Sequence, residues 1–181
     1  MNQSVSSDPE SSWQIRLKGK TLKALMGPNA AYYGDHVELS DGRDDFATTV
    51  GIGGIIGTKF TWPVGAKQDS KVDLTPEHEP VWAKWSEAYH AKMLPAGTYL
   101  GSLYDIGFDK PEAHAIQKEG KMYYAFYANE WNGEVELRGL EARSYRVLDY
   151  VNQKDYGSVS GPAAKLAVQF SRNLLLEAVP E

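Results

Sequence analysis

The sequence has 181 residues, a formal net charge of −5, no cysteine and an aromatic content of 12%. The absence of cysteine excludes disulfides, thiolate metal sites and a cysteine nucleophile, and the scattered Lys and Arg residues argue against a protein that tracks nucleic-acid phosphates. No stretch approaches the roughly 20 apolar residues of a membrane-spanning helix, and the N-terminus has no secretory signal pattern, so we expect a chain that is soluble as written.

The first half of the sequence alternates between helical and extended patterns. Apolar residues recur at near-helical spacing before Gly27-Pro28, which ends the first segment. Thr75-Pro76 supplies an N-cap and a proline at the first helical position of a later one. The predicted helices are 10–26, 43–50 and 75–93, and the predicted strands are 32–39 and 58–62. The last helix is expected to bury Val81, Trp82, Trp85, Tyr89 and Met93. This alternation is typical of βα units with a parallel sheet.

Beyond Pro95 the pattern changes to short β-rich runs separated by turn signals such as Glu119-Gly120 and Asn132-Gly133. The predicted strands are 97–104, 113–118, 122–128, 134–140, 145–152, 165–170 and 174–179. About seven strands at such intervals indicate an antiparallel β-sandwich. We therefore predict two domains, an α/β region over residues 1–95 and an all-β region over residues 96–181.

The α/β region is too small to be a complete parallel-sheet domain. Three or so βα units cannot close a barrel, and an open parallel sheet normally has helices on both faces. Either these units form a small unusual layer, or their partners lie on sequence outside this chain. In the second case, residues 1–95 should present an exposed apolar face where the partner packs.

The glycine run over residues 51–57 invites comparison with a phosphate-binding loop. Its spacing does not fit G-x-G-x-x-G, and an extended segment follows where a helix is needed. We therefore expect these glycines to serve close backbone packing and tight turns, and no nucleotide cofactor.

Two residues of the first half are candidates for chemistry. His36 ends an extended segment, and a histidine at the C-terminal end of a βα-barrel strand faces the active site; the alternative is a structural histidine bonded to a neighbouring carbonyl. Asp8 lies directly before the first helix, where it is either a reactive acid or an N-cap followed by Pro9. None of the four histidines has a second ligand at metal spacing, so no metal site is predicted.

Several segments resemble the late barrel and C-terminal domain of one enzyme group. They are the stretches 24–39, 43–63, 97–100, 123–128 and 147–150, which together span nearly the whole chain. These stretches are similar to glycoside hydrolase clan D, the α-galactosidase or melibiase-like families 27 and 36. The resemblance implies the C-terminal portion of a (β/α)8 TIM barrel followed by an antiparallel β-sandwich, and a carbohydrate of the α-galactoside type as the partner.

The same resemblance implies roles for five residues. Family members are retaining glycosidases with a nucleophilic aspartate and an acid/base aspartate, and the context of Asp8 is similar to that of the acid/base. A retaining mechanism places two carboxylates about 5–5.5 Å apart. The positions matched to the sugar pocket are Asp35, His36, Arg43 and Trp62.

The chain departs from the family pattern in one respect. The nucleophile normally occurs in a Lys-Tyr/Trp-Asp motif, and no such motif precedes Asp8 in these 181 residues. We expect the chain alone to be inactive and its barrel to be completed by the missing N-terminal half-barrel, supplied either in the same reading frame or by a neighbouring segment. The alternatives are a non-catalytic carbohydrate-binding module and a structural β-domain that caps a partner's barrel.

Overall fold

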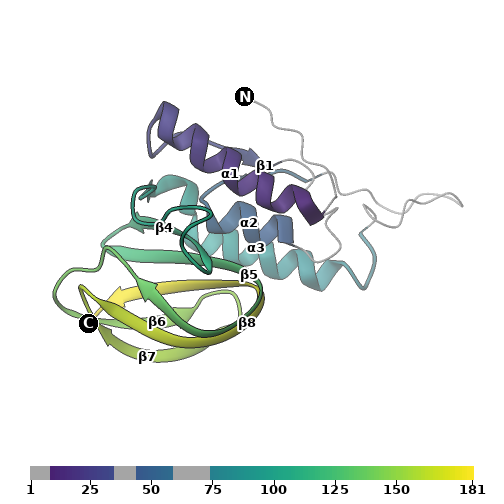
Figure 1. Cartoon of the computed structure of the whole chain (residues 1–181). Coiled ribbons are helices and arrows are strands. Elements are labelled where there is room, and N and C mark those ends of the chain that lie inside the picture. The colour runs from purple at the N-terminus through teal and green to yellow at the C-terminus, as the bar shows by residue number, and fades with distance from the viewer. Residues whose placement is uncertain (1–8, 35–43, 59–73) are drawn as a thin grey trace, which may run out of the picture.

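The computed structural model describes residues 9–34, 44–58 and 74–181, and in it three helices lie over one face of an antiparallel sheet (Figure 1). Its helices are α1 (Pro9–Met26), α2 (Asp44–Gly51), α3 (Glu79–Lys92) and the short 3-10 helix η2 (Leu94–Ala96). Its strands are β1 (Tyr33–Gly34), β2 (Ile55–Ile56), β3 (Thr98–Tyr99), β4 (Glu112–Lys118), β5 (Lys121–Leu137), β6 (Ser144–Asp149), β7 (Lys154–Ser160) and β8 (Ala164–Pro180).

The predicted βα pattern of the first half is present as one β1–α2–β2 unit. The two strands are parallel, with Tyr33 opposite Ile55, and the amide of Gly57 donates to the carbonyl of Gly34 at 2.6 Å. β2 begins at Ile55, ahead of the predicted strand 58–62, most of which lies outside the described residues. Two parallel strands do not form a barrel, so the barrel portion remains a proposal.

The helices agree with the sequence pattern except at the start of α3. We expected Thr75 to cap this helix, but residues 76–78 form a turn and the helix begins at Glu79. The reason is that Thr75 accepts backbone hydrogen bonds from His78 and Glu79, which closes a separate turn, and Pro80 then fits the first turn of the helix because it lacks an N–H.

The buried face of α3 is close to the predicted one. Trp82, Trp85 and Tyr89 are buried as expected, together with Ala88. Val81 is only half-buried. Met93 was expected to be buried but is exposed, because it takes a left-handed backbone conformation with φ of 43° as the C-cap and turns away from the buried face.

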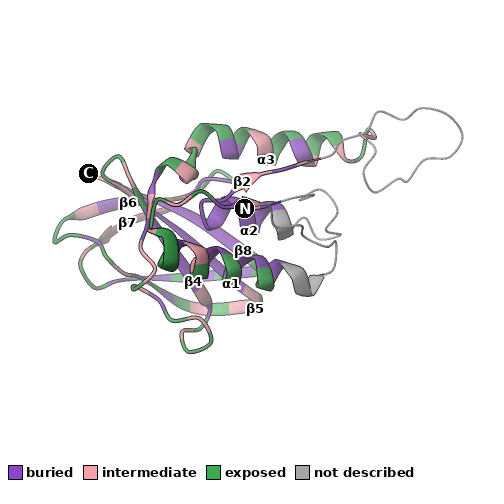
Figure 2. Cartoon of the chain, turned by 90° about the horizontal axis from the view of Figure 1, so that it is seen from above, coloured by how far each residue is buried: buried purple, intermediate pink, exposed green. Residues whose placement is uncertain are grey.

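α2 lies at the centre of the helical layer, between α1 and α3, and all its described side chains are buried (Figure 2). On one side Thr49 lies against Gly34 of β1, and on the other Gly51 lies against Ala125 and Tyr127 of β5. A Cβ on Gly51 would lie 2.6 Å from the Ala125 Cβ, closer than such atoms approach. The prediction that the glycine run serves close packing is confirmed.

The second half forms a six-stranded antiparallel sheet in the order β3-β4-β5-β8-β6-β7. β4 and β5 are joined by a two-residue hairpin at Glu119-Gly120, and both residues have positive φ, as a type I′ turn requires. Beyond the part of β5 that pairs with β4, β5 and β8 continue as a long ribbon.

The ribbon corrects the predicted strand count. We expected separate strands at 122–128 and 134–140, and at 165–170 and 174–179, but each pair is one 17-residue strand. Asn132-Gly133 is no turn because both of its flanks pair with β8, and a turn signal makes a hairpin only when its flanks pair with each other. The register shifts between Ala128 and Glu130, and such a bulge bends a strand.

The bend brings the far end of the ribbon over the rest of the sheet, which gives the sandwich-like core. Val135 and Leu166 of the ribbon pack in one buried cluster with Tyr124 of β5 and with Tyr145 and Val147 of β6. β7 was not predicted as a strand because most of its side chains are exposed and Gly157 interrupts it.

A second buried cluster joins the helices to the sheet. Phe46 of α2 and Trp85 of α3 pack there with Tyr123, Ala125 and Leu175 from the opposite face of the sheet. The helical layer and the antiparallel sheet therefore share one core across the predicted boundary near Pro95.

Candidate functional site

The five residues predicted from the sequence to form the site lie outside the described part of the chain. They are Asp8, predicted as the acid/base, and Asp35, His36, Arg43 and Trp62, predicted to bind the sugar. An adjacent residue in the sequence is described for three of the five: Pro9 after Asp8, Gly34 before Asp35 and Asp44 after Arg43.

The described neighbours of these residues mark one edge of the parallel sheet. Gly34 ends β1 immediately before Asp35, and Ile56, its partner, ends β2 on the way to residues 59–62. Because β1 and β2 are parallel, their carboxyl ends lie at the same edge of the sheet. Between these two strands the chain runs through α2, whose first residue is Asp44.

Small residues let the layers approach closely at this edge. A Cβ on Gly34 would lie 2.5 Å from the Thr49 hydroxyl oxygen of α2, and one on Gly57 would lie 2.2 Å from the Tyr33 hydroxyl oxygen. Only glycine fits at either position without moving its neighbour. This edge of the parallel sheet is therefore closely packed at Gly34 and Gly57.

A buried ion pair fixes α1 against the antiparallel sheet. Arg16 donates to both carboxylate oxygens of Glu112 on β4, at 2.7 and 3.0 Å, and to the hydroxyl of Thr48 on α2 at 3.1 Å. Its guanidinium carbon also lies 4.2 Å from the centre of the Tyr127 ring, and the Tyr127 hydroxyl donates to the carbonyl of Ala47 at 2.9 Å. Elements from both halves of the chain thus meet at one guanidinium.

The ion pair continues into a buried histidine. His114 Nε2 lies 2.8 Å from Glu112 Oε1, and its Nδ1 lies 2.7 Å from the Tyr99 hydroxyl. Burial opposes charge on Glu112, but the hydrogen bonds from His114 and Arg16 outweigh it and lower the pKa of the carboxyl to about 2. Burial lowers the pKa of His114. A neutral His114 that donates from Nε2 and accepts from Tyr99 at Nδ1 satisfies both contacts.

Sequence reasoning did not single out Arg16 or Glu112. Arg16 belongs to a predicted helix and Glu112 lies one residue before a predicted strand, but they are 96 positions apart, and no local pattern marks a contact of that range. One signal was present: Arg16 lies at helical spacing on the buried side of α1, between Ile15 and Gly19, where an arginine needs an anionic partner.

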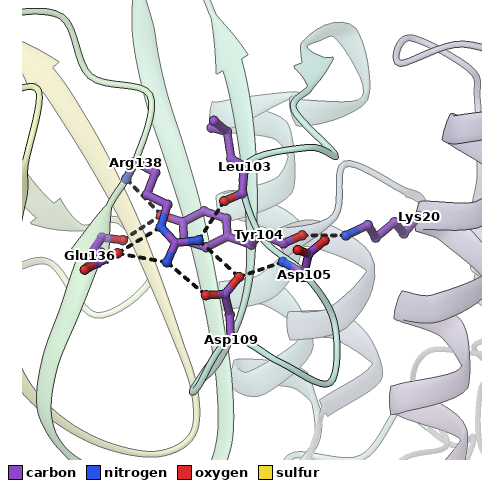
Figure 3. A network of polar contacts seen from close by, with 7 residues as sticks. All are labelled: Lys20, Leu103, Tyr104, Asp105, Asp109, Glu136 and Arg138. Carbon is purple, nitrogen blue, oxygen red and sulfur yellow. Dashed lines mark hydrogen bonds and ion pairs between the residues drawn. The ribbon is translucent and has the colours of Figure 1, made fainter.

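A second polar network holds the loop before β4 (Figure 3). Arg138 donates to both carboxylate oxygens of Asp109, at 2.9 and 3.1 Å, and to Glu136 at 2.9 Å. Lys20 of α1 donates to the carbonyl of Tyr104 at 2.6 Å, and the Tyr104 hydroxyl donates to the carbonyl of Glu136. This network is a scaffold contact between α1, the loop and β5.

The described residues contain no group of three or more His, Cys, Asp and Glu side chains that could hold a metal ion. Within the same residues, no helix is long and apolar enough to span a membrane.

No model of a known protein family matches the chain. The chain is similar in sequence to a curated protein, an A type blood α-D-galactosamine galactosaminidase from Flavonifractor plautii. The two are 31% identical over 99% of the length of the chain. The chain spans only 16% of the length of that protein.

Solved structures share the fold of the chain. A family 27 β-L-arabinopyranosidase from Geobacillus stearothermophilus aligns with all of the chain, with a TM-score of 0.59 and 12% identity. The aligned part is 44% of the length of the arabinopyranosidase. α-Galactosidase I from Mortierella vinacea aligns with 94% of the chain, with a TM-score of 0.54 and 11% identity. The aligned part is 45% of the length of the α-galactosidase. The chain thus spans less than half of each of these enzymes.

These comparisons agree with the resemblance read from the sequence. The galactosaminidase match supports a relationship to the α-galactosidase-like glycoside hydrolases, and the solved structures show that the described arrangement of helices and sheet is one found in such enzymes.

Proposed function

We propose that the chain is the C-terminal part of a retaining glycoside hydrolase of the α-galactosidase and galactosaminidase type. Residues 1–95 would supply the last βα units of the catalytic barrel, and residues 96–181 the β-sandwich behind it. The observation that carries the proposal is the 31% identity to a galactosaminidase over 99% of the chain. The parallel β1–α2–β2 unit, packed on an antiparallel sheet, supports it.

In this proposal Asp8 is the acid/base. It would protonate the glycosidic oxygen as the leaving group departs, and then deprotonate the water that releases the sugar. The acid form requires a raised pKa, which a nearby anionic nucleophile provides. His36, Asp35 and Arg43 would bind sugar hydroxyls, and Trp62 would lie against a face of the ring. None of these roles requires a cofactor.

The nucleophile would come from a separate segment that carries strands 1 to 5 of the barrel. The Lys-Tyr/Trp-Asp motif is absent from these 181 residues, so one carboxylate of the pair has to be supplied. α1 supports such a partner, since it carries four of the six large exposed hydrophobic side chains among the described residues. These four are Trp13, Leu17, Leu25 and Met26.

The test is reconstitution. The chain is mixed with a half-barrel segment that carries the Lys-Tyr/Trp-Asp motif, and turnover of nitrophenyl α-galactoside and nitrophenyl α-galactosaminide is measured. We expect turnover in the mixture and none from either part alone. A mixture that forms a complex without turnover would instead favour a non-catalytic carbohydrate-binding or structural module.

A further inference from the structure

A groove of about 600 Å³ lies between the first turns of α1 and the bend of the β5–β8 ribbon. Its walls include Trp13 on α1 and Trp131 on β5, and its floor includes Arg16, Glu112 and Tyr127. This volume is within the range of about 300–1,000 Å³ that is typical of small-molecule sites.

The floor of the groove is an ion pair whose two side chains hold each other in position. Arg16 and Glu112 neutralise each other through two hydrogen bonds, and the side chains are only 10% and 12% exposed. Their hydrogen-bonding atoms are held in place before any ligand arrives, so little side-chain entropy is lost on binding. A hydroxyl group, which both donates and accepts, can pair with a fixed guanidinium and carboxylate side by side.

The walls offer carbon surface. Trp13 is 47% exposed. Trp131 is half-buried, and its indole Nε1 is buried without a hydrogen-bond partner among the described residues. The polar edge of this ring is therefore turned inward, and the part of Trp131 left at the groove is carbon. Such aromatic surface packs against the C–H face of a pyranose ring.

The charges around the groove select among ligands. Lys110 and Arg172 lie at the groove with Glu130, so that the lining has an excess of only one positive charge once the Arg16–Glu112 pair is counted as neutral. An anion would be repelled by the Glu112 carboxylate at the floor. A purely apolar ligand would bury the ion pair without offering hydrogen bonds in place of those to water, which costs free energy. An uncharged, polyhydroxylated ligand meets neither penalty.

We propose that this groove is a binding site for a neutral oligosaccharide, formed by residues other than the five assigned to catalysis and to the sugar pocket. It has two tryptophan walls for the sugar faces and a fixed Arg16–Glu112 floor for the hydroxyls. Trp13 lies in the early turns of α1, the helix that begins directly after Asp8, so a long glycan held here would extend along the same end of that helix. The site needs no nucleophile and therefore exists in the chain by itself.

The test is a titration of the 181-residue chain with raffinose and maltotriose, followed by the indole N–H signals in nitrogen-15 NMR. We expect saturable shifts of the Trp13 and Trp131 signals with at least one trisaccharide, with a dissociation constant on the order of 1 mM, and none with sodium sulfate. The Trp131→Phe variant, which keeps an aromatic ring at the wall, assigns the Trp131 signal and should bind within about twofold of the parent.

Two variants locate the site. Trp13→Ala should weaken binding about fivefold or more, because it removes one wall. Leu17→Ala, one turn further along α1 and outside the groove, is the matched control and should bind like the parent. Unchanged Trp13 and Trp131 signals with both trisaccharides, or equal weakening by the two variants, would overturn the proposal. Since the titration does not depend on turnover, its failure is distinguishable from failure of the reconstitution.

Discussion

At the scale of single residues, the contact between Arg16 and Glu112 has the largest predicted effect on stability. Glu112→Gln leaves a buried guanidinium without its counter-ion, and we expect a loss of about 3–5 kcal/mol in the free energy of unfolding at pH 7. Glu134→Gln is the matched control, because its 3.8 Å contact with Lys165 is exposed, and it should change stability by no more than about 0.5 kcal/mol. Urea unfolding measures both; similar losses would contradict the role given to Glu112.

The same cluster predicts how stability depends on pH. Glu112 has a folded-state pKa of about 2 against an ordinary value of 4.5, so its contribution is present above pH 4.5 and is lost as the pH falls towards 2. The pKa of His114 is lowered from 6.5, so the unfolded chain takes up that proton first and stability also falls as the pH drops below 6.5. Urea midpoints measured between pH 7 and 3 should decrease throughout. The Glu112→Gln variant should lose the part of the decrease below pH 4.5, and a flat profile in the parent would exclude the assignment.

Asp8 can be tested for an acid/base role separately from a capping role. Asparagine caps a helix about as well as aspartate but cannot donate a carboxylic proton. In the reconstituted enzyme, Asp8→Asn should therefore leave the melting temperature nearly unchanged and slow unactivated substrates by about 10²–10⁴-fold. Nitrophenyl substrates, whose leaving group needs little protonation, should be slowed much less. Equal slowing of both would favour the cap.

At the scale of elements, the end of α3 contains a correctable strain. Met93 has a left-handed backbone, which costs a non-glycine residue roughly 1–2 kcal/mol, and its side chain is 40% exposed. Met93→Gly should therefore raise the free energy of unfolding by up to about 1 kcal/mol. Ala83→Gly, at an exposed position inside the same helix, should lower it by about 1 kcal/mol. Thermal denaturation of the two variants checks the opposite signs.

Sequence patterns correctly predicted the parts of the fold that are determined by residues close together in the chain. The first helix was placed within one residue at each end, because apolar spacing and Gly27-Pro28 are local signals. The start of α3 was wrong because Thr75 closes a separate turn, and β7 was missed because most of its side chains are exposed and Gly157 interrupts it. The ribbon of β5 and β8 was wrong because it depends on partners distant in the sequence: Asn132, for example, pairs with Gln169. For the same reason the Arg16–Glu112 pair was not foreseen, whereas the five predicted site residues rest on resemblance and remain predictions.

At the scale of the whole molecule, the cluster shared by helices and sheet should make the chain unfold as one unit. Residues 96–181 alone would expose Tyr123, Ala125, Tyr127 and Leu175, which pack against the helical layer in the full chain. We expect the full chain to show a single calorimetric transition, and the shorter piece to melt about 10 °C lower or more and to bind hydrophobic dyes. Equal melting temperatures would show that the sheet is stable without the helices.

The order of the strands also bears on aggregation. The most apolar run of the sheet, residues 174–176, is fully buried in β8, which is paired on both sides by β5 and β6. The outermost strands are poor templates for another molecule: β3 is only two residues long, and β7 has exposed Lys154 and Asp155 at its start and a left-handed Gly157 inside it. Short, charged or irregular outer strands disfavour the addition of further strands. The chain therefore keeps its most fibril-prone segment in the interior of the sheet, where intermolecular β-pairing would first require unfolding.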